Sequence, residues 1–62
     1  MNTHFKHEDT VYFLHSVSSI TYNSERKQML VYFVDDFKLT LSEGEEAYES
    51  LYEEFEFWKD ES

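Results

Sequence analysis

The sequence MLVYFVDDFKLTL, residues 29–41, decides the fold of this chain. Residues 29–34 are all apolar, which is typical of a strand that is buried on both faces. Asp35 and Asp36 are turn formers that interrupt this run, and alternating apolar and polar residues at 37–41 predict a second strand with one wet face. The stretch is therefore expected to form a tight antiparallel hairpin.

Two weaker apolar runs precede this hairpin, at residues 11–14 and 19–22. They predict either two strands or one bent strand, because the break between them near Ser16 is soft. A polar segment at residues 23–27, which starts with turn formers, separates them from the central strand. The sheet is therefore expected to be an antiparallel meander of three or four strands.

A helix is expected after the hairpin. Ser42 followed three residues later by Glu45 is the pattern of a capping box, and acids crowd the first turn, where the helix dipole favours them. Between Glu43 and about Lys59, apolar residues recur with the helical spacing of one buried stripe, at Ala47, Tyr48, Leu51, Tyr52, Phe55 and Trp58. The predicted fold class is α+β, a small antiparallel meander packed by one C-terminal amphipathic helix.

Length and composition indicate one small folded domain. The chain has 62 residues and no cysteine, so neither a disulfide nor a thiolate zinc site can staple it, and dense aromatic packing or oligomerisation must substitute. Aromatic residues make up 19% of the chain, which supports a folded protein over a disordered acidic one. Residues 1–9 are polar and aperiodic, so we expect a flexible leader there and a single domain over residues 10–62.

The charge is strongly asymmetric along the chain. The formal net charge is −9, and all of it lies in residues 32–62, because acids and bases balance in residues 1–31. This charge disfavours nucleic acid or an anionic membrane as a direct ligand and favours a partner protein with a basic surface. The N-terminus does not resemble a signal peptide and no stretch approaches the ~20 apolar residues of a membrane span, so a cytoplasmic location is expected, in the host if the protein is viral.

The residue pattern predicts a binding protein and not an enzyme. General acid/base catalysis needs a carboxylate desolvated in a cleft, whereas these acids fall on the wet side of a helix. His4, His7, Glu8 and Asp9 form an H-x-x-H-E-D pattern, but no further ligand has a fixed relation to them. Neither a metal nor a cofactor is expected, and His15 is expected to be an ordinary residue at a strand edge.

The central strand presents an apolar set on each of its faces, and one helix can cover only one of them. The second face is expected to be a homodimer or partner interface, as twofold homodimers are the commonest assembly. Alternatively, Tyr12, Leu14 and long polar side chains shield this face. The residues assigned to this interface are Tyr12, Leu14, Leu30, Tyr32 and Val34.

Opposite the apolar stripe, acids of the predicted helix follow one another at steps of three and four residues. Neighbours in such a row are about 5 Å apart along the helix axis, which is comparable to the spacing of phosphates in one nucleic-acid strand. The alternative is a solvated face with no partner. The row comprises Glu46, Glu49, Glu53, Glu56 and Asp60, with Glu45 beside it and Phe57 on the same side as a candidate contact anchor.

Two functions are consistent with these features. In size, charge and lack of catalytic motifs, the chain is similar to small virus- or phage-encoded inhibitors that occupy the nucleic-acid site of a host or defence enzyme. This similarity of composition implies a DNA mimic that presents its acidic helix to a basic cleft. The alternative is a small structural or adaptor subunit that homodimerises or binds a partner through the apolar sheet face.

Overall fold

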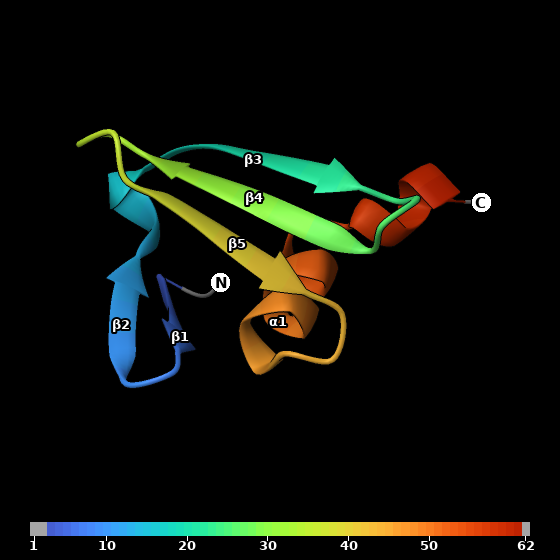
Figure 1. Ribbon diagram of the computed structural model, residues 1–62, viewed down its shortest axis with the longest axis horizontal. Coiled ribbons are helices and arrows are strands. Elements are labelled where there is room, and N and C mark those ends of the chain that lie inside the picture. The colour runs from blue at the N-terminus through green and yellow to red at the C-terminus, as the bar shows by residue number, and fades with distance from the viewer. Residues whose placement is uncertain (1–2, 62) are drawn as a thin grey trace.

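The protein folds into two antiparallel sheets and one helix. A computed structural model describes the backbone of residues 3–61 and the side chains of residues 3–59. The predicted α+β class is confirmed (Figure 1). In chain order the elements are β1 (His4–His7), β2 (Thr10–Phe13), the 3-10 turn η1 (Leu14–Ser16), β3 (Val17–Asn23), β4 (Gln28–Phe33), β5 (Lys38–Ser42), α1 (Glu46–Glu54) and the 3-10 helix η2 (Phe57–Glu61).

Strands β3, β4 and β5 form a three-stranded meander with β4 in the centre. The β4–β5 turn falls at the two aspartates, as predicted. Asp36 adopts a left-handed φ of 71°, and the Asp35 carboxylate accepts a hydrogen bond from the Phe37 amide at 3.3 Å. The β3–β4 turn is also where it was expected, with the Asn23 side chain accepting a hydrogen bond from the Arg26 amide at 3.1 Å. Local turn chemistry thus sets the register of the sheet.

Residues 11–22 form two separate strands, which settles the question left open by the sequence. The 3-10 turn η1 ends β2, and β3 then starts in the other sheet. β2 pairs instead with β1, with Phe5 opposite Tyr12 and His7 opposite Thr10.

The prediction of a flexible leader over residues 1–9 is wrong for the part that the structure describes. His4–His7 is a strand, and the Phe5 side chain is only 4% exposed. Its ring stacks on that of Tyr12, with the centroids 5.4 Å apart. The physical reason is that burying one large aromatic ring is enough to fix a short strand, even where its neighbours are polar. Residues 1 and 2 lie outside the described residues.

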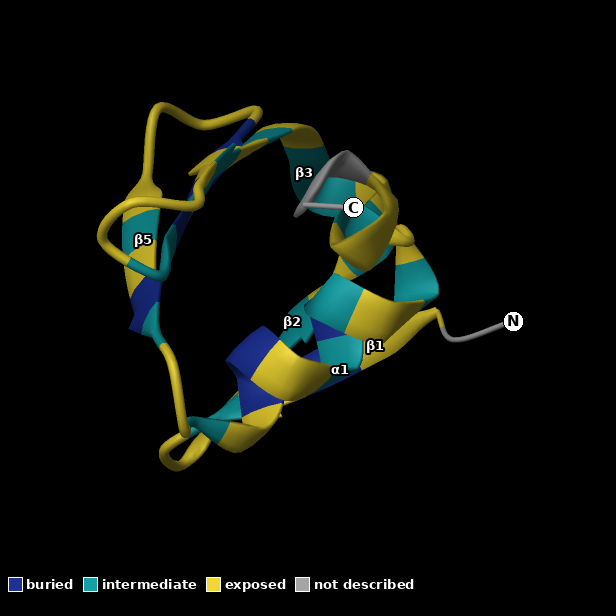
Figure 2. Ribbon diagram, turned by 90° about the vertical axis from the view of Figure 1, so that its right-hand side faces the viewer, coloured by how far each residue is buried: buried dark blue, intermediate teal, exposed yellow. Residues whose placement is uncertain are grey.

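The core lies between the three-stranded sheet, the β1–β2 hairpin and α1. Met29, Val31 and Phe33 of β4 point into it, whereas Leu30 is half-buried and Tyr32 exposed, as the pleat of a strand requires. Figure 2 shows buried segments of α1 and of the sheet on the inner side of the molecule. The remaining buried residues are Phe5, Leu41, Ala47, Tyr48 and Leu51.

The predicted helix over residues 43–59 is wrong at both ends. α1 begins only at Glu46, because Gly44 adopts a left-handed φ of 97° and residues 42–45 form a turn, closed by a hydrogen bond from the Glu45 amide to the Ser42 carbonyl at 3.1 Å. It ends at Glu54, and Glu56 beyond it also has a left-handed φ, of 55°. Both left-handed residues break the repeat of helical dihedral angles.

The early end of α1 changes which aromatic side chains are buried. Ala47, Tyr48 and Leu51 are buried as predicted, but Phe55 and Trp58 are each 47% exposed. The expected buried stripe therefore stops within α1. It stops because the helical spacing that would bring Phe55 and Trp58 onto the same face ends with the helix.

Candidate functional site

The acidic face of α1, defined here as Glu46, Glu49 and Glu53, is the most strongly charged surface held by a single element. All three side chains are exposed, and none forms an ion pair within the described residues. Their steps of three and four residues place them on one side of the helix, over about 10 Å at ~1.5 Å per residue. α1 contains no lysine or arginine, so nothing on the helix itself offsets this charge.

The other predicted members of the acidic row are not part of this face. Glu56 lies beyond the end of α1, and its carboxylate is paired with the Lys59 ammonium at 2.6 Å. The side chain of Asp60 lies outside the described part of the chain. The expectation of a continuous row over about four turns is therefore wrong, because α1 supplies little more than two turns.

Phe57 does not lie where the sequence placed it. It was expected on the acidic side as a contact anchor, but its half-buried ring packs beside that of Tyr22, with the centroids 5.3 Å apart. Once α1 has ended, the chain is free to turn this ring toward the sheet. Burying an aromatic ring against another is favourable, whereas leaving it on a charged surface is not.

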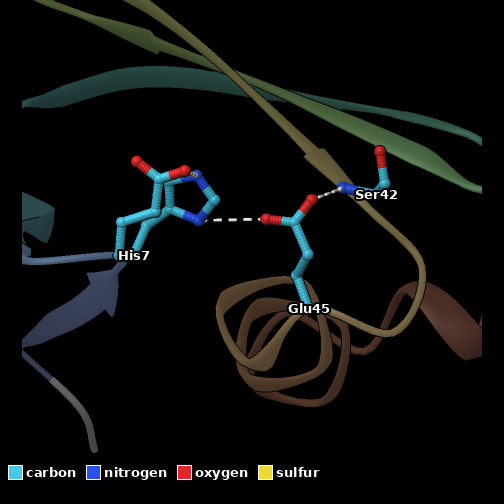
Figure 3. A network of polar contacts seen from close by, with 4 residues as sticks. His7, Ser42 and Glu45 are labelled. Carbon is cyan, nitrogen blue, oxygen red and sulfur yellow. Dashed lines mark hydrogen bonds and ion pairs between the residues drawn. The ribbon is translucent and has the colours of Figure 1, made fainter.

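Glu45 is the centre of a polar network that joins three elements (Figure 3). One of its carboxylate oxygens lies 3.1 Å from Nδ1 of His7 in β1, and the other accepts a hydrogen bond from the Ser42 amide at 3.0 Å. The second contact is half of the predicted capping box, although residues 43–45 are not helical. Because Glu45 is engaged on both oxygens, it acts as a structural tie and not as a free charge.

The two histidines of the H-x-x-H pattern do not converge. His7 has a side chain that is 15% exposed and faces Glu45, whereas exposed His4 lies beside Thr3 and the ring of Phe13. Residues three apart on a strand point to opposite faces, so the helical geometry that could bring both imidazoles to one metal is not available. Within the described residues, no group of three potential metal ligands is found. His15 is exposed and stacks on Phe13.

The outer face of the sheet is narrower and more polar than the sequence suggested. Tyr32 is 36% exposed and Leu30 is half-buried. Leu30 lies between Thr21 of β3 and Thr40 of β5, and Tyr32 has Ser19 and Lys38 as its cross-strand neighbours. Short polar side chains and a lysine therefore flank the two apolar ones.

Tyr12 and Leu14 do not belong to this outer face, which corrects the predicted interface. The Tyr12 ring lies 5.3 Å from that of Phe33 and 6.1 Å from that of Phe37, and both Tyr12 and Leu14 pack against the core. The reason is topological. β2 belongs to a separate hairpin on the inner side of the meander and does not extend it.

Val34 belongs to a different apolar surface at the end of β4. It is 69% exposed and, with Val11, Phe13 and Phe37, lines a shallow groove of about 270 Å³. These residues come from β2 and from the β4–β5 turn, which are distant in sequence. Sequence reasoning missed this cluster because no local pattern links the two segments.

The arrangement is suited to presenting charge and apolar side chains to a partner. Among the described residues, no charged or polar residue is buried. Every buried side-chain nitrogen or oxygen in this part of the chain has a hydrogen-bond partner. No helix in the described part of the chain is long and apolar enough to cross a membrane. Comparison of the chain with models of protein families, with curated proteins and with solved structures found no match.

Proposed function

We propose that this is a small binding protein that docks the acidic face of α1 onto a basic surface of a partner protein. The observation that carries the proposal is that Glu46, Glu49 and Glu53 are exposed on one side of one helix and form no ion pair within residues 3–59. The whole chain, with its net charge of −9, adds a long-range field of the same sign. Such a field raises the rate of association with a basic surface.

A face kept only for solubility is the alternative, and the composition of α1 speaks against it. Solvated helices usually intersperse lysines with glutamates, since Glu–Lys pairs at i, i+4 stabilise a helix by about 0.2–0.5 kcal/mol each. α1 has glutamates at such positions, Glu49 and Glu53, and they repel each other. A helix that accepts this cost is best explained by a partner that supplies the missing cations.

The class of partner follows from the spacing of the carboxylates. Steps of about 5 Å along the axis resemble the spacing of phosphates, so we propose a partner surface that otherwise binds nucleic acid, and an inhibitory effect when it is occupied. The face holds three carboxylates, so the contact on the partner is a compact group of a few lysines or arginines. A cytoplasmic location is part of this proposal, and the absence of cysteine supports it.

The test begins with capture of a partner at low salt, followed by affinity measurements on the purified pair. The triple variant Glu46→Gln, Glu49→Gln, Glu53→Gln is compared with a matched triple, Asp9→Asn, Glu25→Gln, Asp36→Asn, which changes the net charge equally at exposed sites off the helix. We expect only the helix triple to weaken binding and flatten its salt dependence. Duplex DNA should compete with the parent protein for binding to the partner. If both triples bind equally well, the acidic face is not the contact.

A second candidate function is a structural or adaptor subunit that binds through apolar side chains. It is favoured by the exposed cluster Val11, Phe13, Val34 and Phe37, because contiguous apolar surface on a small protein commonly marks an interaction site. Salt separates the two candidates. Binding through this cluster should be nearly independent of ionic strength, whereas binding through the acidic face should weaken steeply as it rises.

A further inference from the structure

Strand β3 lies at one edge of the three-stranded sheet and lacks the residues that usually prevent an edge strand from pairing. Within the described residues it pairs only with β4, and its other side is open (Figure 1). Edge strands are normally protected by charged residues or proline, which prevent pairing with another chain. β5, at the opposite edge, carries Lys38, whereas Val17–Asn23 contains neither a charge nor proline. A register shift between Val17 and Ser19 leaves the regular part of this edge at residues 19–23.

The edge lies within the longest uncharged stretch of the chain. Residues 10–24 contain none of the fourteen acidic and five basic residues. Two copies of a protein with a net charge of −9 repel each other over most of their surfaces. An uncharged strip is where a second copy meets the least repulsion. By the same argument a basic partner gains nothing there, since the strip offers no carboxylate to pair with it.

An apolar groove runs beside this edge. It measures about 470 Å³, and its lining consists of apolar residues and two serines, with no charged residue: Leu14, Val17, Ser18, Ser19, Ile20, Phe55 and Phe57. Phe55 is 47% exposed, although a ring of this size contributes strongly to stability when it is covered. The early end of α1 thus leaves aromatic surface next to the outer edge of β3.

We propose that the protein forms a twofold homodimer in which β3 pairs antiparallel with β3 of a second copy, so that the two meanders join into one six-stranded sheet. An antiparallel strand is self-complementary about a twofold axis, as an isologous interface requires. The groove beside the edge receives apolar surface of the partner copy. A domain of this size that has no cysteine, and therefore no disulfide, gains stability from such pairing. This interface is independent of the acidic face of α1 and differs from the outer sheet face around Leu30 and Tyr32.

The test is charge complementation at the β3 edge. The average mass is measured by sedimentation equilibrium between about 5 and 500 µM, because a dimer with a micromolar-to-millimolar dissociation constant changes its average mass over this range. Two double variants place like charges at exposed positions of β3: Ser19→Lys with Thr21→Lys, and Ser19→Glu with Thr21→Glu. We expect the parent to dimerise and each double variant to stay monomeric, because like charges on paired strands repel. An equimolar mixture of the two should dimerise again, because opposite charges then face each other. Thr40→Glu, at the other edge, should dimerise like the parent.

Three sedimentation results would overturn the proposal. The first is a parent that stays monomeric at 500 µM, and the second is a pair of folded double variants whose mixture does not dimerise. The third is loss of the dimer in the variants Tyr32→Glu and Thr40→Glu as well as in the β3 double variants. That result would place the dimer contact on the outer face of the sheet. Amide exchange of the parent covers the case in which a double variant fails to fold. Amides of residues 19–23 that point away from β4 should gain at least about tenfold protection at high concentration, as paired amides do, and unchanged rates would refute β3 pairing.

Discussion

Helix α1 and strand β3 present opposite kinds of surface. The outer side of α1 consists of glutamates without a compensating cation on the helix, whereas β3 carries no charge at all. A helix satisfies its own backbone hydrogen bonds, so its outer face can be devoted to charge. An edge strand has backbone N–H and C=O groups without a strand partner, and because β3 has no charged side chain, nothing repels a second strand from these groups. A domain this small can therefore keep a long-range electrostatic surface and a short-range pairing surface apart by placing them on different elements.

The largest effect is expected from Phe5→Ala, which tests whether the acidic face depends on the β1–β2 hairpin. α1 packs more extensively against β1 than against β5, and Phe5 anchors β1 in the core. Truncation of a buried phenylalanine typically costs about 3–5 kcal/mol of unfolding free energy. Chemical denaturation should show this loss, and amide exchange should show that α1 loosens before β3 and β4. Unchanged stability would mean that residues 4–7 are a leader after all.

The next largest effect tests whether the acidic face of α1 and the edge of β3 act independently. The triple variant Glu46→Gln, Glu49→Gln, Glu53→Gln should weaken binding to a basic partner by about a hundredfold, because contacts between charged groups are worth about 1.5–3 kcal/mol each and are not additive. Its self-association should be at least as strong as that of the parent, because three fewer negative charges reduce the repulsion between two copies. Partner titration and sedimentation of the same sample measure both quantities. Loss of both activities together would show that the two surfaces are not separate.

A smaller effect is expected at the tie between β1 and the start of α1. His7→Ala removes the partner of one Glu45 carboxylate oxygen, and loss of a polar contact of this kind costs about 0.5–1.5 kcal/mol. The midpoint of urea unfolding should fall accordingly. His4→Ala is the matched control, because His4 is exposed, and its effect should stay within about 0.5 kcal/mol. Equal effects of the two variants would show that the contact between His7 and Glu45 does not stabilise the fold.

The smallest effect concerns the repulsion on the acidic face itself. Glu53→Lys replaces a repulsive pair with Glu49 by an attractive one in the last turn of α1, where the helix dipole also favours a cation, so it should raise the unfolding free energy by about 0.5 kcal/mol while weakening partner binding. Glu25→Lys, in the β3–β4 turn, gives the same change in net charge away from α1 and serves as the control. Thermal unfolding at low salt measures the gain. A fall in stability would show that Glu53 makes a favourable contact and that repulsion between Glu49 and Glu53 does not destabilise α1.

The elements that have local signals could be predicted from the sequence. The apolar run that became β4, the aspartates of its turn and the Asn23 turn needed only the chemistry of neighbouring residues. The same is true of the helical spacing of Ala47, Tyr48 and Leu51, all of which are buried. The charge asymmetry of the chain is likewise a property of sequence alone.

The sequence was not sufficient at positions where contacts between distant segments compete with the local pattern. β1 exists because Phe5 is buried against Tyr12, and a single apolar residue among polar ones produces no periodic signal. The helical pattern continued past Glu54, yet the helix did not, since the left-handed Glu56 lets Phe57 pack against Tyr22. For this reason the length of the acidic face and the exposure of Phe55 beside β3 could not be read from the sequence. Both depend on how much free energy a distant aromatic contact contributes relative to one more helical turn.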